Sequence, residues 1–256
     1  MRLKLEMKLT NLFLVRDNHS SFISFLKKAL TQCNDGKQFE KFYKDTNVKD
    51  FTFTLSLGKC KYTKEKIILE NEKIYIIVSI KDKGMDKFII YNALLNQRNK
   101  KFPLPEGNSM TLVNITQIKS EEIKSSKIIA KTTIGSGLCV REHNPETNKD
   151  KYYVFNEEGF EQQLYKILEQ QGINAGFSKL FPYTTLFRSC SNIKFIPINC
   201  KKVVSMHYGQ YIDITIGTFQ LEGDSRLLQY FYECGLGSRT SSGYGMIDIL
   251  QQEGGI

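Results

Sequence analysis

The feature that most constrains the fold of this chain is an order of strand and helix patterns that occurs twice. Residues 1–9 alternate charged and apolar side chains, which is the period of a half-buried strand. A helical pattern, a pair of strand-like runs, a second helical pattern and a further strand follow, and the same order resumes at residue 127. We therefore predict an α+β protein with two βαββαβ units in tandem, the topology of ferredoxin-like and RRM-like domains.

The repeated order divides the chain into two predicted domains, residues 1–122 and 123–256. The first comprises a strand at 1–9, a helix around 22–30, a short helical stretch at 38–44, strands at 51–57, 66–69 and 73–80, a helix at 85–95 and a strand at 110–118. The second comprises a strand at 127–133, a helix at 157–171, a hairpin of 193–205 and 208–221, a helix at 224–234 and a strand at 244–250. No residue-level repeat accompanies this order, so the prediction depends on the order of the elements alone.

Positive charge is concentrated in the first domain. The chain has 36 Lys and Arg against 27 Asp and Glu, a formal net charge of +9. The first 100 residues hold 20 basic and 11 acidic side chains, whereas the remaining residues are balanced. A surface that binds a polyanion is one interpretation, and a basic protein with well-spread lysines is the other.

The spacing of cysteine and histidine indicates no metal site. The six cysteines form no C-x-x-C pair and no metal-ligand spacing with the three histidines, so we predict no metal and no cofactor. His143 and His207 fall in or near turns and are assigned to structure. No stretch approaches the ~20 apolar residues of a transmembrane helix, and we predict a cytoplasmic protein with reduced thiols and no membrane partner.

One segment, Leu180–Ser189, differs from the rest of the chain. Its ten residues match the in-frame translation of a common sequencing adapter. We predict that it is an assembly artefact, and the alternative is a natural loop between the 157–171 helix and the next strand. No functional residue is placed in it.

The most specific motif is a glycine-rich loop at residues 235–245, with the pattern G-x-G-x5-G-x-G. Glycines allow a backbone to approach phosphate groups closely, and an arginine inside the loop adds a charged fork. The loop follows a helix and precedes a strand, whereas dinucleotide-binding and P-loop motifs follow a strand and precede a helix, so both are excluded. The candidate phosphate-binding residues are Gly235, Gly237, Arg239, Gly243 and Gly245, and a purely structural turn is the alternative.

The surroundings of the loop extend the motif. Leu221-Glu-Gly and a helix with Leu227 and Leu228 precede the loop, and Met246 follows it on the last strand. In these features the chain resembles the CRISPR-associated RNA-processing endoribonucleases, the Cas six family of the RAMP superfamily. Similar segments elsewhere are Met1-Arg-Leu, Phe51-Thr-Phe-Thr-Leu55, Gly137-Leu-Cys-Val-Arg141 followed by Thr147-Asn-Lys-Asp150, and Lys201-Lys-Val203.

The resemblance implies two ferredoxin-like domains that bind the repeat of a CRISPR transcript and cut it once. In such enzymes the 2′-hydroxyl beside the scissile bond attacks the phosphorus without a metal, leaving a 2′,3′-cyclic phosphate and a 5′-hydroxyl. The implied partners are CRISPR repeat RNA and other subunits of a CRISPR effector complex, and homodimerisation is left open. The reaction requires a base, an acid and a cation beside the phosphorane.

Five residues of the first domain are candidates for that chemistry. Tyr43 and Lys49 match the positions at which many members of the family carry a catalytic His and Lys, although a tyrosine with its usual pKa of ~10 is a poor base near neutral pH. His19, at the start of the first helix, is the other candidate for proton transfer because an imidazole has a pKa of ~6.5. Lys27 and Lys28 on the same helix are candidates for binding RNA phosphates, or they form a solvated face.

Three functions follow from these observations. The leading hypothesis is a metal-independent endoribonuclease that is specific for the repeat. An RNA-binding RAMP subunit that has lost cleavage is the alternative, because Tyr43 stands in place of a histidine. A ferredoxin-like sensor of a small molecule is the third.

Overall fold

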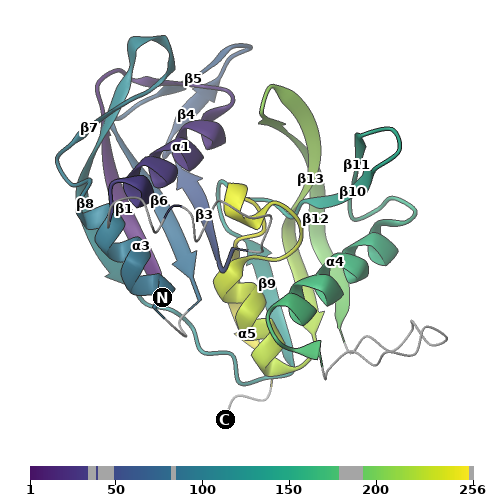
Figure 1. Ribbon diagram of the computed structural model, residues 1–256. Helices are drawn as coiled ribbons and strands as arrows, with labels where there is room; N and C mark the ends of the chain where they lie inside the picture. Colours follow the sequence, from purple (N-terminus) through teal and green to yellow (C-terminus); the bar gives the residue numbers. More distant parts are fainter. Residues whose placement is uncertain (34–38, 40–48, 82–84, 179–192, 254–256) are drawn as a thin grey trace.

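The computed structural model describes residues 1–33, 39, 49–81, 85–178 and 193–253. Most of the predicted helical stretch at 38–44, Tyr43 included, and the segment Leu180–Ser189 lie outside the described residues. Figure 1 shows two halves side by side, each with a sheet that is covered by helices. The helices are α1 (Asn18–Thr31), α3 (Asp86–Leu95), α4 (Phe160–Asn174) and α5 (Ser225–Cys234).

Five antiparallel strands form the N-terminal sheet, in the order β3-β6-β1-β8-β7. Alternation along β1 buries Leu3, Leu5 and Met7 beneath the helices, as the period of two predicts. Apart from β7, the spatial order is second, third, first and fourth strand of the unit, which is the ferredoxin-like arrangement. The strands are β1 (Arg2–Leu9), β3 (Phe51–Ser56), β6 (Lys73–Ile80), β7 (Lys101–Pro103) and β8 (Ser109–Ile118).

The C-terminal sheet repeats this arrangement with four antiparallel strands, in the order β12-β13-β9-β14. The face of α4 that was predicted from its spacing packs into the core through Phe160, Leu164 and Leu168. The carboxylate of Asp224 caps α5 by accepting a hydrogen bond from the N–H of Arg226 (3.0 Å). The strands are β9 (Lys127–Thr132), β12 (Lys194–His207), β13 (Gln210–Glu222) and β14 (Ile247–Gln252).

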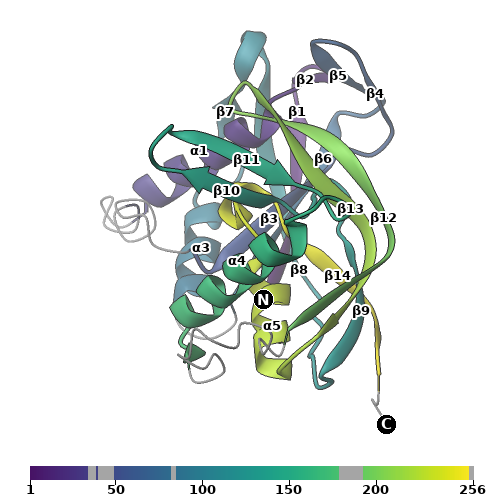
Figure 2. The same cartoon turned by 90° about the vertical axis from the view of Figure 1, so that its right-hand side faces the viewer.

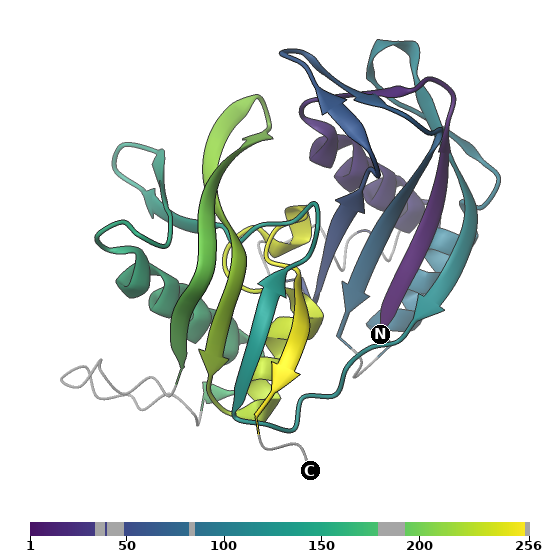
Figure 3. The ribbon, with the colours of Figure 1, turned by 180° about the vertical axis from the view of Figure 1, so that it is seen from behind.

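The helices of both halves lie on one side of the molecule, and the sheets lie on the other. The helices are in front of the sheets in Figure 1 and behind them in Figure 3, and Figure 2 shows the two layers from the side. Each half has a separate hydrophobic core between its sheet and its two helices. Both sheets therefore present their uncovered faces on the same side of the protein.

Several short elements are added to the two ferredoxin-like units. β2 (Phe13–Val15), β5 (Lys66–Leu69) and β4 (Cys60–Tyr62) form a small sheet, and β10 (Val140–Asn144) pairs with β11 (Lys149–Tyr153). Only β5 is predicted from the sequence, because three residues are too few to show a period and the two hairpin strands lack apolar alternation. Two short 3₁₀ helices, η2 (Pro105–Gly107) and η5 (Thr240–Ser242), complete the structure.

Two boundaries differ from the sequence prediction. The last strand begins at Ile247 rather than at residue 244, because Tyr244 and Gly245 belong to the glycine-rich loop and Met246 lies between the loop and the strand. α4 begins at Phe160 rather than at residue 157, because Gly159 has a φ of 87°, outside the helical region. The predicted domain boundary between residues 122 and 123 falls in the connection from β8 to β9, and it stays a prediction.

A buried arginine joins the two halves. The side chain of Arg2, on β1, donates hydrogen bonds to the carbonyl oxygens of Ile247 (2.5 Å) and Tyr232 (3.3 Å) and pairs with the carboxylate of Asp248 (2.9 Å). Its guanidinium carbon also lies 3.9 Å from the centre of the Tyr232 ring. The positive charge is therefore compensated where the first strand of one domain meets the last helix and last strand of the other.

The helices in the described part of the chain are unsuited to crossing a bilayer, since none combines sufficient length with sufficient apolar character.

Candidate nucleic-acid interface at the domain junction

The glycine-rich loop, residues 235–245, packs against the N-terminal domain. Thr52 Oγ1 of β3 donates a hydrogen bond to the carbonyl oxygen of Tyr244 (2.9 Å). η5, which lies inside the loop, contacts both α1 and β3. In Figure 1 the loop lies in yellow between the two halves. It therefore brings the C-terminal motif next to the helix that carries His19.

The packing of this loop requires glycine at its four predicted positions. The φ angles are +91°, +92°, +95° and +76° at Gly235, Gly237, Gly243 and Gly245. A Cβ on Gly237 would lie 2.7 Å from the carbonyl oxygen of Cys139, and one on Gly243 would lie 2.9 Å from the Phe53 ring. The N–H of Gly237 donates to Gln171 Oε1 (3.1 Å) and that of Gly245 donates to the Gly137 carbonyl (2.9 Å). These groups are used inside the protein, and their binding of RNA stays a prediction.

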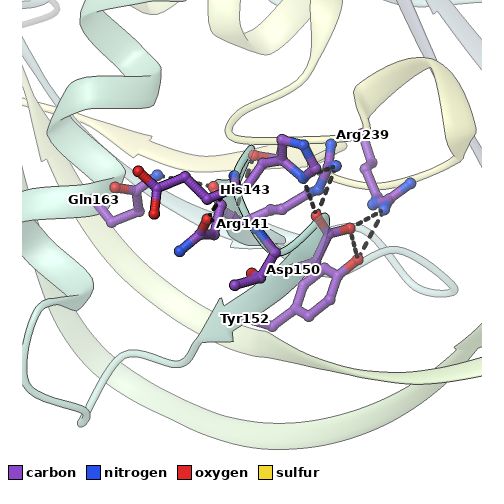
Figure 4. A network of polar contacts seen from close by, with 10 residues as sticks. Arg141, His143, Asp150, Tyr152, Gln163 and Arg239 are labelled. Carbon is purple, nitrogen blue, oxygen red and sulfur yellow. Dashed lines mark hydrogen bonds and ion pairs between the residues drawn. The ribbon is translucent and has the colours of Figure 1, made fainter.

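Arg239 is held by a polar network from the C-terminal domain. Its guanidinium donates to the Asp150 carboxylate (3.0 Å), to the Tyr152 hydroxyl (2.8 Å) and to His207 Nε2 (2.9 Å). Figure 4 shows the contacts with Asp150 and Tyr152, which reach Arg239 from β11. The residue itself has a φ of +58°, in the left-handed region. Arg239 thus pins the glycine-rich loop to its own domain.

Asp150 is the anionic centre of this network. Arg141 pairs with its carboxylate at 2.7 Å and His143 Nδ1 lies 2.8 Å from it, both from β10. Hydrogen bonds, first from Arg141 and then from His143, lower the pKa of Asp150 well below its ordinary value. The side-chain amide of Gln163 on α4 donates to the Arg141 carbonyl oxygen (2.9 Å) and anchors β10 (Figure 4).

His207, at the end of β12, is buried against the network. An arginine side chain can only donate, so His207 Nε2 accepts from Arg239 and the ring is neutral with its proton on Nδ1. Burial, and then the charge of Arg239, lowers the pKa of His207 to about 4. Its Nδ1 has no hydrogen-bond partner among the described residues. His207 therefore belongs to the junction, although it was assigned to structure from its place near a turn.

His19, in the first turn of α1, is buried on the other side of the loop. Its side chain is 9% exposed, and burial lowers its pKa to about 4 against the opposite effect of a hydrogen bond to the backbone of Gly135. Its Nδ1 lies beside Gly243 and has no hydrogen-bond partner among the described residues. At neutral pH the ring is uncharged and able to accept a proton.

Tyr244 links the two histidines. Its ring centre lies 5.1 Å from that of His19 and 5.4 Å from that of His207, both in edge-to-face geometry. Its hydroxyl is hydrogen-bonded to Ser205 Oγ (3.1 Å), and burial raises its pKa. The row His19, Tyr244, His207 and Arg239 thus runs from one domain to the other.

A cleft of about 450 Å³ opens beside this row. Its lining comes from α1, β3, β4 and β5 of the N-terminal domain, and from β12, β13 and the loop after β9 in the C-terminal domain. The N–H of Gly209, in the turn between β12 and β13, donates to the Asp17 carboxylate (3.0 Å), so the tip of this hairpin is fixed to the start of α1. His19 and Tyr244 both line the cleft.

Lys49 lies within the electrostatic reach of Lys27 on α1. Burial, and then the charge of Lys27, lowers the pKa of Lys49. Lys27 is eight residues from His19 on α1, which is about 12 Å along the helix axis. Lys28 lies instead over the Phe102 ring, with its Nζ 5.4 Å from the ring centre. The structure therefore associates Lys49 with Lys27, and Tyr43 is outside the described residues.

Within the described ranges, no three side chains of His, Cys, Asp or Glu gather in a way that would hold a metal ion. The five described cysteines, at positions 33, 60, 139, 200 and 234, are free thiols. The donors that converge at the junction are arginines, histidines and tyrosines.

A family model for the C-terminal part of CRISPR associated protein Cas6 matches residues 118–249, just over half of the chain. The chain belongs to the Cas6 family. The resemblance derived from the glycine-rich loop and its flanking segments is thereby confirmed. No curated protein matches the sequence.

Solved structures extend the similarity of this Cas6 chain to both halves. The product of a Cas6-related gene from Pyrococcus furiosus is 19% identical with a TM-score of 0.76, and 98% of each chain is covered. A RAMP protein that binds different RNA substrates is 18% identical with a TM-score of 0.78, covering 98% of this chain and 100% of that one. A CRISPR associated protein Cas6 is 20% identical with a TM-score of 0.70, covering 98% and 99%. These matches confirm the predicted tandem ferredoxin-like fold.

The Cas6 chain brings together only some of the residues selected from its sequence. His19, Gly243 and Arg239 lie along one row, although the first belongs to a different domain from the others. Arg239 is bound by His207 and Asp150, and neither was selected from the sequence. Each of these two residues is at least 32 positions away from Arg239 in the chain. The one available signal is the pair of long alternating runs around Tyr208 and Gly209, which predicts a hairpin but not where its tip lies.

Proposed function

We propose that this Cas6-family chain binds the repeat of a CRISPR transcript and cuts it once, by attack of a 2′-hydroxyl on the adjacent phosphorus. The bond from phosphorus to the 5′-oxygen breaks, which gives a 2′,3′-cyclic phosphate and a 5′-hydroxyl. Membership of the family, through the match over residues 118–249, carries the proposal. The similar fold of a RAMP protein that binds different RNA substrates and of a Cas6 product complex supports it.

In this proposal the chemistry uses residues of the N-terminal domain. His19 is the base in this proposal, because its ring is neutral at pH 7 and its Nδ1 has no hydrogen-bond partner among the described residues. Burial lowers its pKa to about 4 and so makes it a weaker base than a free imidazole. Lys49 stabilises the charge that develops on the phosphorane, and Tyr43 orients the leaving 5′-oxygen or donates a proton to it. Lys27 and Lys28 on α1, with the glycine-rich loop, bind phosphates on either side of the cut.

One observation favours a second function, RNA binding without cleavage. His19 is nine-tenths buried, and its ring is hydrogen-bonded to the backbone of Gly135. It is also about two helical turns from Lys27, the residue whose charge lowers the pKa of Lys49. A base and a cation that act on one phosphate must lie within a few ångströms of it. If they do not come together on RNA, the chain is a RAMP subunit that binds but does not cut.

Incubation with end-labelled RNA of the source organism's CRISPR repeat, in EDTA, separates these functions. Cleavage is expected with the all-ribose RNA and not with RNA that carries 2′-deoxyribose at the cut site. We expect His19→Asn and Lys49→Ala to slow the single-turnover rate by about 10²- to 10⁴-fold and to leave the Kd for RNA nearly unchanged.

The matched control is Lys119→Ala, since the Lys119 side chain is 84% exposed and lies in the connection between the domains. It should cut at the rate of the unmodified protein. Tight binding without cleavage by the unmodified protein would establish the second function. Cleavage of the deoxy RNA would exclude attack by the 2′-hydroxyl.

A further inference from the structure

The cleft beside the junction has apolar walls from both domains. Leu55, Leu57 and Ile67 line it on the N-terminal side, and Val203, Ile214 and Ile216 line it on the C-terminal side. Its volume of about 450 Å³ is within the range of ~300–1,000 Å³ that is typical of pockets for small organic groups. The faces of a nucleobase are apolar and flat, so such walls suit an unstacked base.

The mouth of the cleft carries an aromatic ring and a cation that contact each other. Tyr62 of β4 is 59% exposed, which is unusual for a large aromatic side chain that lines a cleft. The guanidinium carbon of Arg16 lies 4.9 Å from the centre of the Tyr62 ring, and both residues line the cleft. An exposed tyrosine is a stacking surface for a base, and an adjacent arginine is a fork for a phosphate.

The β4–β5 hairpin beside the cleft carries positive charge that no ion pair among the described residues neutralises. Lys59, Lys61 and Lys64 are exposed on the β4–β5 hairpin, where Glu65 is the only acidic residue between Gly58 and Lys66. Among the described residues, neither these three lysines nor Arg16 forms an ion pair. Arg239 and Arg141, in contrast, are paired with Asp150. An uncompensated basic hairpin beside an aromatic ring attracts the backbone of a nucleic acid.

We propose that this cleft binds one unpaired nucleotide of the RNA, with its base between the apolar walls and against Tyr62 and its phosphate on Arg16. The proposal rests on the RNA binding proposed above and assigns a recognition element, the β4–β5 hairpin, outside the glycine-rich loop. Asn18 and Ser205 add polar side chains to the lining, where Asn18 donates to the carbonyl oxygens of Val15 and Arg16 and Ser205 is hydrogen-bonded to Tyr244. A paired base cannot enter, so the site selects single-stranded RNA.

The test uses repeat RNA that carries 2′-deoxyribose at the cut site, with 2-aminopurine placed at one unpaired position at a time. We expect the fluorescence to change on binding at one position, because the base moves from its neighbours onto Tyr62. Tyr62→Ala should remove that change and weaken binding by about 5- to 100-fold, and Tyr62→Phe should retain both. Arg16→Ala should reduce the slope of log Kd against log salt by about 0.7.

Tyr91→Ala is the matched control, because Tyr91 is a partly exposed tyrosine on α3, among the helices and outside the cleft lining. If the protein binds the RNA but Tyr62→Ala binds as tightly as Tyr91→Ala, the nucleotide site is overturned and the proposed function stands. If the unmodified protein binds no repeat RNA, both are overturned. A fluorescence change that millimolar AMP abolishes without displacing the RNA would assign the cleft to a free nucleotide and overturn the proposal.

Discussion

The two domains have the same strand order but use their cations differently. In the N-terminal domain Arg16, Lys59, Lys61 and Lys64 have no ion pair among the described residues; Arg16 lines the cleft, and the three lysines lie on or next to the β4–β5 hairpin, whose Tyr62 and Ile67 line it. In the C-terminal domain the arginines of the junction are bound by Asp150. Residues 101–256 hold equal numbers of acidic and basic side chains, whereas the first 100 residues hold an excess of basic ones.

This difference shows that an arginine in a specific sequence motif need not be a ligand for RNA. Arg239 lies in the most specific motif of the sequence, but its donors are used by Asp150, Tyr152 and His207. The less conspicuous hairpin of β4 and β5 carries lysines that have no ion pair among the described residues. The N-terminal domain thus has accessible cations beside the cleft, whereas Arg239 of the C-terminal domain holds the glycine-rich loop in place.

Removing Asp150, which binds the arginines of the C-terminal domain, should have the largest effect on stability. Asp150→Asn leaves Arg141 and Arg239 side by side without a carboxylate, so the free energy of unfolding should fall by about 2–3 kcal/mol in urea denaturation. Asp213→Asn is the control, because Asp213 pairs with Lys202 at a more exposed site and its loss should cost less than about 1 kcal/mol. Equal losses in the two variants would show that the network is not a structural centre.

Lowering the pH tests the stability of the junction, where one histidine from each domain is buried. The pKa values of His19 and His207 are lowered to about 4, so the folded state holds both rings neutral while the unfolded chain takes up protons below pH ~6.5. Stability should be complete above pH 6.5 and decline as the pH falls towards 4, by about 2 kcal/mol per histidine at pH 5.

Thermal unfolding between pH 7.5 and 4.5 measures this decline, and His207→Gln should roughly halve it. The pKa of Asp150 is lowered, so its contribution is present above the ordinary carboxyl pKa of ~3.9 and is lost only below that value. The two effects therefore occupy separate pH ranges. A melting temperature that is independent of pH in this range would contradict the burial of neutral histidines.

The smallest effect on stability should come from the accessible charges. The double change Lys59→Ala and Lys61→Ala should alter the free energy of unfolding by less than about 0.5 kcal/mol. It should nevertheless lower the salt dependence of RNA binding, by about 0.7 in the log–log slope for each phosphate that the variant no longer neutralises. The pair Lys119→Ala and Lys124→Ala, which are exposed but lie beside Glu121 and Glu122, should leave the slope unchanged.

Much of the fold was predictable because its signals are local. The alternation in β1 and the apolar spacing of α4 and α5 are visible in a few consecutive residues, and their repeated order determines the topology. β2, β4 and the β10–β11 hairpin were missed because their residues lack a period, and these elements build the cleft mouth and the Arg239 network. The additions to the common fold were therefore the least predictable part.

Only the part of the site that is contiguous in the sequence was predictable. The glycine-rich loop is contiguous, so its position between α5 and β14 follows directly from the sequence. The row that joins His19 to Tyr244 and His207 depends on how two domains dock, and no periodicity encodes that orientation. The role proposed for the exposed Tyr62 likewise depends on its contact with Arg16, which lies 46 positions earlier in the chain.

The clamp made by Arg2 also has a consequence for synthesis of the protein. During synthesis β1 emerges before β6 and β8, and it can pair with those strands as soon as they have emerged. The partners of Arg2, at Ile247 and Asp248, emerge about 245 residues later. A nascent N-terminal domain therefore waits with an unpaired guanidinium at its edge until β14 arrives. The contacts of Arg2 with Ile247 and Asp248 can therefore form only after β14 has been synthesised, and products truncated before β14 lack them.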